Sequence, residues 1–352
     1  MTWRDKLIDI QPYTAGEQPT RGDIIKLNSN ENPFPPAPGV EAVIKNFPVD
    51  TLRKYPQIDG KDLRQAAADY YGLNPESVFT ANGSDEVLAL AFRGFFNSPK
   101  PILFPDITYS FYPVWCKYYG IIYERPPVDE GFRIHPEDYF RENGGIIIAN
   151  PNAPTGIELT REQIIAIMDH NRDSVVIIDE AYVDFGGKSS IDLISRYDNL
   201  LIVQTFSKGR SLAGMRVGLA FGSPELISVL TAVKNSFNSY PLDSLAQAAA
   251  IASLADDVYF RKRVKQVITV RENTKAALER LGFLVTDSKA NFLFAANEEV
   301  NAESLKTWLL GQDILIRHFD LPGINNHVRI TIGTEAQMDS LIEKIEEYLL
   351  VK

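Results

Sequence analysis

Lys208 follows an apolar run that is typical of a buried strand. The run LLIVQTF spans residues 200–206, and the segment QTFSKGRSLAGMRVG then places Arg216 eight residues after the lysine. Desolvation disfavours the charged form of a lysine, and the neutral amine is a nucleophile for a carbonyl carbon. The pattern therefore predicts Schiff-base chemistry at Lys208. Taken alone, however, two such residues are more often a solvated loop lysine and a surface arginine.

A carboxylate and a phenol follow another apolar run. The run VVII, residues 175–178, is followed by Asp179, with Tyr182 three residues further on. At the end of a strand these side chains could reach the same ligand as Lys208. The alternative is a helix-capping aspartate and a packing tyrosine.

Further segments offer an anion site, an aromatic ring and amides. In ANGSDE the backbone N–H groups of Gly83, Ser84 and Asp85 would point outward from a helix start, where phosphates bind. A plain helix cap is the alternative interpretation. In PDITYSFY, Tyr109 offers a flat aromatic surface, and NPNAPTG, residues 150–156, offers amide side chains in a loop that its prolines keep irregular.

Together these segments carry the groups that pyridoxal phosphate requires. Its aldehyde needs a lysine, its pyridinium nitrogen needs a carboxylate, and its phosphate needs a helix start and a cation. Lys208, Asp179 and Arg216 would fill these places, with the helix start near Ser84. The joint occurrence of these signals favours the functional interpretation over the separate structural ones.

The elements that must position these residues are strands separated by helices. Short apolar runs with intervening helices are typical of a mostly parallel sheet that is buried on both faces. Ligands of such sheets bind beyond the carboxyl ends of the strands, which is where Lys208 and Asp179 stand. The runs are ILF (102–104), IIIA (146–149), VVII (175–178), LLIVQTF (200–206) and VGLAF (217–221).

The rest of the chain predicts a second, smaller α/β unit. Residues 242–281 have a long helical pattern, and the strands FLVT, NFLFA, ILIRHF and VRITIG follow around a helix that carries Trp308. The prolines of ENPFPPAPG exclude a regular helix and indicate a linker or ordered arm. A chain of 352 residues also exceeds the usual limit of ~250–300 residues for one core. We expect an N-terminal arm (1–30), a large cofactor-binding domain (31–240) and a small C-terminal domain (241–352).

Composition excludes several classes of function. The chain has 36 Lys and Arg against 46 Asp and Glu, a net charge of −10, without a basic block, which argues against a nucleic-acid or anionic-membrane surface. No apolar stretch approaches the ~20 residues needed to span a membrane. The four histidines have no cysteine partners and no H-E-x-x-H spacing, so no metal site is expected. The single Cys116 and the absence of a secretory pattern in MTWRDKLIDIQPY predict a cytoplasmic protein.

The chain resembles the class-II, fold-type-I pyridoxal-phosphate aminotransferases, and most closely the histidinol-phosphate aminotransferase group among them. The resemblance implies a large domain with a mostly parallel seven-stranded sheet and a smaller C-terminal α/β domain. The segments NENPFPP, RKYP and RITIGT restrict the resemblance to this group. The lysine, DEAY and NPxxPTG segments are shared with the wider superfamily. The matching segments, from Leu27 to Thr334, are LNSNENPFPP, RKYPQIDG, NGSDE, PDITYSFYPV, NPNAPTG, IIDEAYVDF, TFSKGRSLAGMRVG, KNSFNSYPLD, ANFLF and RITIGT.

The resemblance assigns roles around the cofactor. It implies that Lys208 forms the Schiff base, Asp179 pairs with the ring nitrogen, Tyr182 bonds the ring hydroxyl and Tyr109 stacks on the ring. Lys208, Asp179 and Tyr182 would be the catalytic residues. The residues around the cofactor phosphate would be Ser84, Asp85, Ser207 and Arg216.

Two cofactor positions need separate comment. Tyr55, in RKYP, matches a tyrosine that enters the phosphate site of the neighbouring subunit, which implies a homodimer with shared sites. The family's ring-hydroxyl asparagine directly precedes PTG, and this chain has Ala153 there. Asn152 is the nearest substitute and is expected to take its place.

Arginines would determine the substrate. Arg329, in RITIGT, matches the arginine that holds a substrate carboxylate, and Arg317, twelve residues upstream, matches a second arginine that favours a phosphate dianion. The alternative for Arg317 is a solvated arginine at a strand end. Tyr13 and Asn30 complete the implied substrate site. The implied reaction is transamination between L-histidinol phosphate and 2-oxoglutarate, giving imidazole acetol phosphate and glutamate in histidine biosynthesis.

Three alternatives remain open at this stage. An aromatic amino-acid aminotransferase and an O-phosphothreonine decarboxylase share the same framework. A non-catalytic member of the superfamily is the third alternative, which the presence of Lys208 disfavours.

Overall fold

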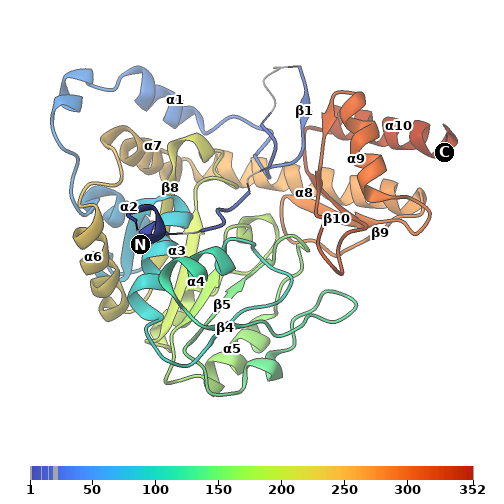
Figure 1. The fold of residues 1–352 in the computed structure, drawn as a ribbon. Helices are drawn as coiled ribbons and strands as arrows, with labels where there is room; N and C mark the ends of the chain where they lie inside the picture. The colour runs from blue at the N-terminus through green and yellow to red at the C-terminus, as the bar shows by residue number, and fades with distance from the viewer. Residues whose placement is uncertain (1, 9, 15, 19–22, 352) are drawn as a thin grey trace.

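A seven-stranded sheet forms the centre of the larger part of the molecule (Figure 1). The computed structural model describes residues 2–8, 10–14, 16–18 and 23–351. Within them the sheet has the order β2-β8-β7-β6-β5-β3-β4; β8 runs antiparallel to both its neighbours, and the remaining pairs are parallel. The strands are β2 (Val78–Asn82), β3 (Ile102–Leu103), β4 (Tyr123–Glu124), β5 (Gly145–Ala149), β6 (Val176–Asp179), β7 (Leu200–Thr205) and β8 (Val217–Phe221).

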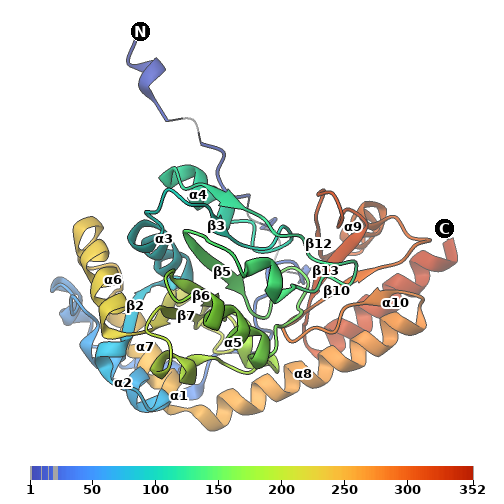
Figure 2. The same cartoon turned by 90° about the horizontal axis from the view of Figure 1, so that it is seen from below.

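Helices cover both faces of this sheet, because successive strand residues point to opposite sides. In β6, Val176 and Ile178 belong to one apolar cluster and Ile177 to another. Figure 2 shows the sheet between the two groups of helices. On the Ile177 side lie α3 (Gly83–Phe95), α4 (Tyr112–Tyr119) and α6 (Pro224–Phe237); on the other lie α1 (Pro38–Lys45), α2 (Lys61–Tyr71), α5 (Arg161–His170) and α7 (Ser244–Ala255).

A second core surrounds a four-stranded antiparallel sheet near the C-terminus. Its strands, in spatial order, are β12 (Arg317–His318), β13 (His327–Thr331), β10 (Phe292–Ala296) and β9 (Leu284–Val285). The helices α8 (Asp257–Arg280), α9 (Ala302–Gly311) and α10 (Glu335–Val351) pack on it. The N-terminal segment joins this unit, since β1 (Ile25–Lys26) pairs with β11 (Ile314–Leu315).

Short 3₁₀ turns connect many of these elements. Two of them matter for the site: η5 follows Tyr182, and η7 precedes Arg216. The turns are η1 (Arg4–Lys6), η2 (Val49–Arg53), η3 (Pro75–Ser77), η4 (Pro136–Tyr139), η5 (Val183–Phe185), η6 (Ile191–Ser195) and η7 (Ala213–Met215).

The structure differs from the sequence-based expectation at three points. The helical pattern of residues 242–281 is two helices, α7 and α8, separated at Asp256. α7 packs in the core of the large sheet, so the change of core comes at Asp256 rather than at the predicted boundary after residue 240. Pro38 begins a helix within the proline-rich segment, because a proline fits the first helical position.

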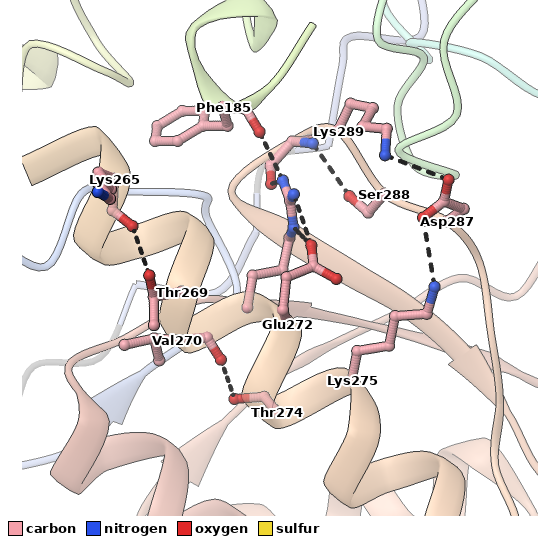
Figure 3. A network of polar contacts seen from close by, with 12 residues as sticks. Phe185, Lys265, Thr269, Val270, Glu272, Thr274, Lys275, Asp287, Ser288 and Lys289 are labelled. Carbon is pink, nitrogen blue, oxygen red and sulfur yellow. Dashed lines mark hydrogen bonds and ion pairs between the residues drawn. The ribbon is translucent and has the colours of Figure 1, made fainter. Parts of the chain in front are cut away.

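The long helix α8 links the two units through a buried arginine. Arg271 donates from Nη1 to Phe185 O (2.7 Å) and to Ala290 O (2.8 Å), and from Nη2 to Glu272. Figure 3 shows Phe185 and Glu272 in this polar network. Phe185 lies in the segment that follows β6 of the large sheet, although its side chain packs in the second core, and Ala290 leads into β10. One guanidinium therefore bonds both the segment that follows β6 and the segment that leads into β10.

The described residues include no helix that is both long and apolar enough to cross a lipid bilayer.

Candidate active site

A cavity of about 660 Å³ opens where the carboxyl ends of the large sheet face the small one. All but two of the predicted site residues line it. The predicted residues that line the cavity are Tyr13, Asn30, Ser84, Asp85, Tyr109, Asp179, Tyr182, Ser207, Lys208, Arg216, Arg317 and Arg329.

Lys208 stands in the loop that follows β7, with its amine at the cavity wall. The loop is fixed by backbone hydrogen bonds from Phe206 N to Val217 O and from Leu212 N to Phe206 O. Lys208 Nζ donates to Ser29 O at 3.3 Å. Because no described carboxylate pairs with this amine, it is available to a ligand in the cavity.

Asp179 is the last residue of β6 and is only 5% exposed. Its Oδ2 accepts a hydrogen bond from Tyr112 Oη at 3.0 Å, whereas its buried Oδ1 has no partner among the described groups. Burial raises the pKa of Asp179 to about 6, and the Tyr112 bond opposes that rise. A buried polar atom without a partner is costly, so a ligand that donates to Oδ1 would be stabilised here.

Tyr182 is held by a residue of the N-terminal segment. Its Oη accepts a hydrogen bond from Asn30 Nδ2 at 2.9 Å, and Asn30 Oδ1 accepts one from Thr331 Oγ1 at 3.0 Å. Asn30 is buried and has a φ of 56°, a conformation that asparagine tolerates better than most residues. The structure thus places Asn30 between Tyr182 and β13 while it also lines the cavity.

The start of α3 and the loop before β8 form a cradle for an anion. Arg216 lies so close to Gly83 that an added Cβ there would stand 2.5 Å from Arg216 Nη2. Gly218 allows a similar approach, since its Cβ would lie 2.5 Å from Ser84 N. The Ser207 hydroxyl accepts from Arg216 Nη1 at 3.4 Å. Backbone N–H groups, a guanidinium and hydroxyls thus converge, as a phosphate requires.

Asp85 connects the cradle to the aromatic wall. Its carboxylate pairs with Arg216 Nη2 at 3.2 Å and accepts a hydrogen bond from Tyr109 Oη at 3.0 Å. Tyr109 in turn packs edge-on against Tyr112, with ring centres 5.6 Å apart. The carboxylate of Asp85 therefore orients two neighbours, and its backbone N–H is the part suited to an anion.

Two arginines face each other at the other end of the cavity. Arg317 and Arg329 are paired across β12 and β13, and both guanidiniums lie over Phe319, at 5.3 and 5.4 Å. Arg329 Nη2 donates to Asn28 O, while its buried Nε has no partner among the described groups. Burial and the charge of Arg317 both lower the pKa of Arg329, and no described carboxylate pairs with either arginine. Like charges directly opposite are destabilising unless an anion compensates them.

Tyr13 closes this end from the N-terminal segment. Its ring stacks on Phe111 at 4.7 Å. Burial raises the pKa of its phenol, and the charges of Arg329 and Arg317 counteract the rise. The phenol remains a hydrogen-bond donor close to the two arginines.

Two predicted residues do not line the cavity. Tyr55 is 81% exposed and stacks on Tyr240, with ring centres 4.6 Å apart. Asn152 is buried, but its Nδ2 donates to Ile107 O (2.8 Å) and its Oδ1 accepts from Thr108 Oγ1 (2.7 Å). Those bonds use the amide to hold the loop before Tyr109, so Asn152 does not take the place of the family asparagine, and Ala153 lines the wall instead.

Sequence reasoning missed Tyr112 and Thr331, which bond Asp179 and Asn30. Both had a signal in the sequence. Tyr112 lies three residues after Tyr109, and Thr331 two residues after Arg329 on the same strand face. Neither spacing, however, identifies a partner that lies far away in the chain.

Comparison with known proteins identifies the family. A model of the aminotransferase class I and II family matches residues 22–345. The chain belongs to this family. It is 52% identical over 349 residues to the histidinol-phosphate aminotransferase of Lactococcus lactis subsp. cremoris (strain MG1363), which covers 99% of this chain and 98% of the relative. It is 51% identical over 344 residues to that of Chromohalobacter salexigens, covering 98% of each chain.

Solved structures of aminotransferases share the fold. The histidinol-phosphate aminotransferase of Clostridium acetobutylicum has a TM-score of 0.85 at 25% identity, over 92% of this chain and 99% of that one. The enzyme of Sinorhizobium meliloti, solved in complex with pyridoxal-5′-phosphate, has a TM-score of 0.83 at 24% identity, over 92% and 91%. The predicted fold-type-I architecture is thereby confirmed.

Members of this family are pyridoxal-phosphate-dependent enzymes, and the cavity fits that cofactor. Asp179 Oδ1 lacks a donor, which the ring nitrogen would supply. The cradle at Gly83 suits the phosphate, and Lys208 Nζ lines the cavity they share.

Proposed function

We propose that the protein catalyses transamination between L-histidinol phosphate and 2-oxoglutarate, giving imidazole acetol phosphate and glutamate in histidine biosynthesis. Relatives of this name, 51–52% identical over nearly the whole chain, support the reaction. The observation that carries the substrate assignment is the pair Arg317 and Arg329, which face the cavity side by side without a described carboxylate.

The arginine pair suits both amino-group donors of such a reaction. A phosphate monoester carries up to two negative charges, and two guanidiniums offer it several charge-assisted hydrogen bonds. The α-carboxylate of glutamate carries one charge and can be held by Arg329 alone. One site can therefore accept a phosphate ester in one half-reaction and a dicarboxylate in the other.

The chain's own residues would move and hold the protons. When bound, pyridoxal phosphate supplies an aldehyde that exchanges amines and a ring that accepts the electron pair of the breaking bond. Lys208 Nζ would transfer the proton at the substrate α carbon. Asp179 would hold the proton on the ring nitrogen, and Tyr182, oriented by Asn30, would bond the ring hydroxyl.

The remaining predicted residues would hold the cofactor in place. Tyr109 would cover one face of the ring. The cradle of Ser84, Asp85, Ser207 and Arg216 would bind its phosphate, and Asp85 keeps Arg216 oriented before the phosphate arrives.

We further propose that the active unit is a homodimer, in which Tyr55 of each subunit reaches the phosphate site of the other. Lys234 Nζ bonds both Ile58 O and Ser239 O, so the segments around Tyr55 and Tyr240 are neighbours. They expose several large apolar side chains, and such a patch is typical of an interface between copies of a chain. These side chains are Leu52, Tyr55, Ile58, Phe237 and Tyr240. The cytoplasmic location remains a prediction.

A panel of half-reactions tests the proposed function. The holoenzyme is mixed separately with histidinol phosphate, phenylalanine, tyrosine and O-phosphothreonine, and the absorbance of the cofactor is followed. Histidinol phosphate is expected to convert the cofactor fastest, and Lys208→Ala is the inactive control. Preference for phenylalanine would instead favour an aromatic amino-acid aminotransferase, and carbon dioxide release from O-phosphothreonine would favour a decarboxylase.

A further inference from the structure

Asp179 can form an ion pair with the cofactor's ring nitrogen only if the proton they share stays on the nitrogen and the carboxylate stays ionised. We propose that Tyr112 is a positioning residue for this purpose: its hydroxyl, by donating to Asp179 Oδ2, keeps the carboxylate ionised and its free Oδ1 turned to the cavity. The inference rests on the proposed function, because it concerns the same cofactor. It assigns Tyr112 a role in addition to packing.

The position of the hydroxyl is fixed by its surroundings. Tyr112 begins α4 and is fully buried, and the bond to Asp179 Oδ2 at 3.0 Å is the one hydrogen bond of its hydroxyl among the described groups. Its ring packs edge-on against Phe104 at 5.8 Å and against Tyr109 at 5.6 Å. Because the ring is enclosed, the hydroxyl is held in place beside Asp179.

The charges around Asp179 make this donor important. From α3, Asp85 contributes a negative charge that disfavours a second carboxylate anion. From α4, the Tyr112 hydroxyl donates to the carboxylate, and the nearby backbone of Ala181 also lowers the pKa of Asp179. The phenols of Tyr109 and Tyr182 face the same cluster. Since no described cation pairs with Asp179, the Tyr112 hydroxyl is the side-chain group that favours its ionised form.

The hydroxyl thereby controls where one proton resides. A hydrogen bond to the carboxylate stabilises its charged form and leaves the proton on the ring nitrogen. Without that bond the carboxylate becomes more basic, and the proton moves from the nitrogen to Asp179 Oδ1. A neutral ring accepts electrons less well, so the reaction slows.

The test is Tyr112→Phe, which removes the hydroxyl and keeps the ring. Holoenzyme is prepared with pyridoxal phosphate labelled with ¹⁵N in the ring, and the ¹⁵N resonance is recorded at one fixed pH. It is expected to move from the pyridinium position toward that of neutral pyridine. The rate kcat is expected to fall on the order of tenfold to a hundredfold, the range for a hydrogen bond to a charged group.

Tyr139→Phe is the matched control. The Tyr139 hydroxyl is likewise buried but has no partner among the described groups, and it lies outside the cavity lining. Its removal should leave the ¹⁵N resonance and kcat unchanged. In an Asp179→Asn background, adding Tyr112→Phe should cause no further movement of the resonance, because the hydroxyl acts through the carboxylate.

An unmoved resonance in Tyr112→Phe, with the cofactor bound, overturns the inference and leaves the proposed function intact. Failure of the unmutated protein to bind the labelled cofactor through Lys208 would overturn the proposed function itself. If Tyr112→Phe does not fold, 4-aminophenylalanine at position 112 keeps the shape and a weaker donor. It should move the resonance in the same direction by less, and no movement would again overturn the inference.

Discussion

At the scale of single residues, the cavity separates two kinds of charge. The end near Arg216 has its positive charge already paired with Asp85, whereas the end near Arg317 and Arg329 has no described counter-charge. A paired cation is pre-oriented, and an unpaired one gains most from an incoming anion. The cofactor end is thus organised before binding, and the substrate end depends on the substrate for its stability.

The first prediction concerns Arg317. Arg317→Ala should raise KM for histidinol phosphate on the order of tenfold to a hundredfold more than KM for glutamate, because the phosphate dianion loses a charge-assisted partner that the carboxylate does not need. Steady-state kinetics with each amino donor measures the difference. Equal losses for both donors would mean that Arg317 supports the fold or binds a group common to both substrates.

The second prediction concerns Glu180, a buried carboxylate outside the cavity lining. It accepts hydrogen bonds from Ser190 N (2.6 Å), Ser189 Oγ and Gln204 Nε2, yet burial raises its pKa to about 7 from an ordinary value of 4.5. The folded state therefore binds this proton more tightly than the unfolded state, and stability falls as the pH rises from about 4.5 to 7. Asp179 and Asp184 add smaller changes in the same direction.

Urea unfolding of the cofactor-free protein at pH 5 and pH 8 measures this effect. Glu180→Gln should reduce the loss of unfolding free energy between the two pH values by about 1–3 kcal/mol, because the amide does not titrate. The free energy of unfolding of the variant should be lower at both pH values, because the amide N–H₂ group would face other hydrogen-bond donors. An unchanged pH difference would show that Glu180 is ionised throughout.

At the scale of elements, the cradle depends on how closely β8 approaches the start of α3. Gly83 and Gly218 make the approach possible, and the start of α3 leaves backbone N–H groups free for an anion. The start of α3 orients the backbone N–H groups, and the loop before β8 supplies the cation of Arg216. A change of one methyl group at their contact should therefore affect cofactor binding before it affects the fold.

The third prediction compares two glycines with similar backbone angles. Gly83→Ala introduces a Cβ within 2.5 Å of Arg216 Nη2 at a φ of 81°, and Gly72→Ala introduces one into open space at a φ of 68°. Both substitutions should cost about 1 kcal/mol of stability through the backbone. Only Gly83→Ala should weaken the affinity of the apoprotein for pyridoxal phosphate, by more than tenfold in a fluorescence titration. Equal affinities of the two variants for pyridoxal phosphate would show that the Arg216 side chain can move away from the added Cβ without loss of binding.

Sequence patterns predicted the elements better than their contacts. The apolar runs at residues 146–149 and 175–178 became β5 and β6, because their buried residues must point to both faces of a sheet. The pairing of Tyr112 with Asp179 spans 67 residues, and the bond from Asn152 to Ile107 spans 45. Such contacts depend on tertiary packing rather than on local spacing, so Asn152 was expected in the wrong place and Tyr112 was missed.

At the scale of the whole molecule, the aromatic side chain of Tyr55 lies on the surface. The stacked pair of Tyr55 and Tyr240 leaves Tyr55 81% exposed, outside the cavity of its own chain. Large aromatic side chains gain free energy when they leave water. The proposed dimer gives this residue both a buried place and a function.

The fourth prediction tests the shared site by mixing. Tyr55→Ala and Lys208→Ala homodimers should each be nearly inactive. After subunit exchange, one site of each hybrid dimer contains both native residues, and activity should recover to about a quarter of the unmutated level if exchange is random. Exchange is verified by mass spectrometry of isotopically labelled subunits. Verified exchange without recovery would place Tyr55 outside the neighbouring site.

The buried Arg271 has a consequence for how the chain unfolds. Its guanidinium bonds Phe185 O in the segment after β6 and Ala290 O in the segment before β10, so separation of the units would break two hydrogen bonds to a charged group. The two units should therefore lose structure together, in one calorimetric transition of the cofactor-free protein. In Arg271→Met the constraint is absent, and the small unit can melt at a lower temperature than the large one. Two hydrogen bonds of one side chain should thus make unfolding cooperative between two separate apolar cores.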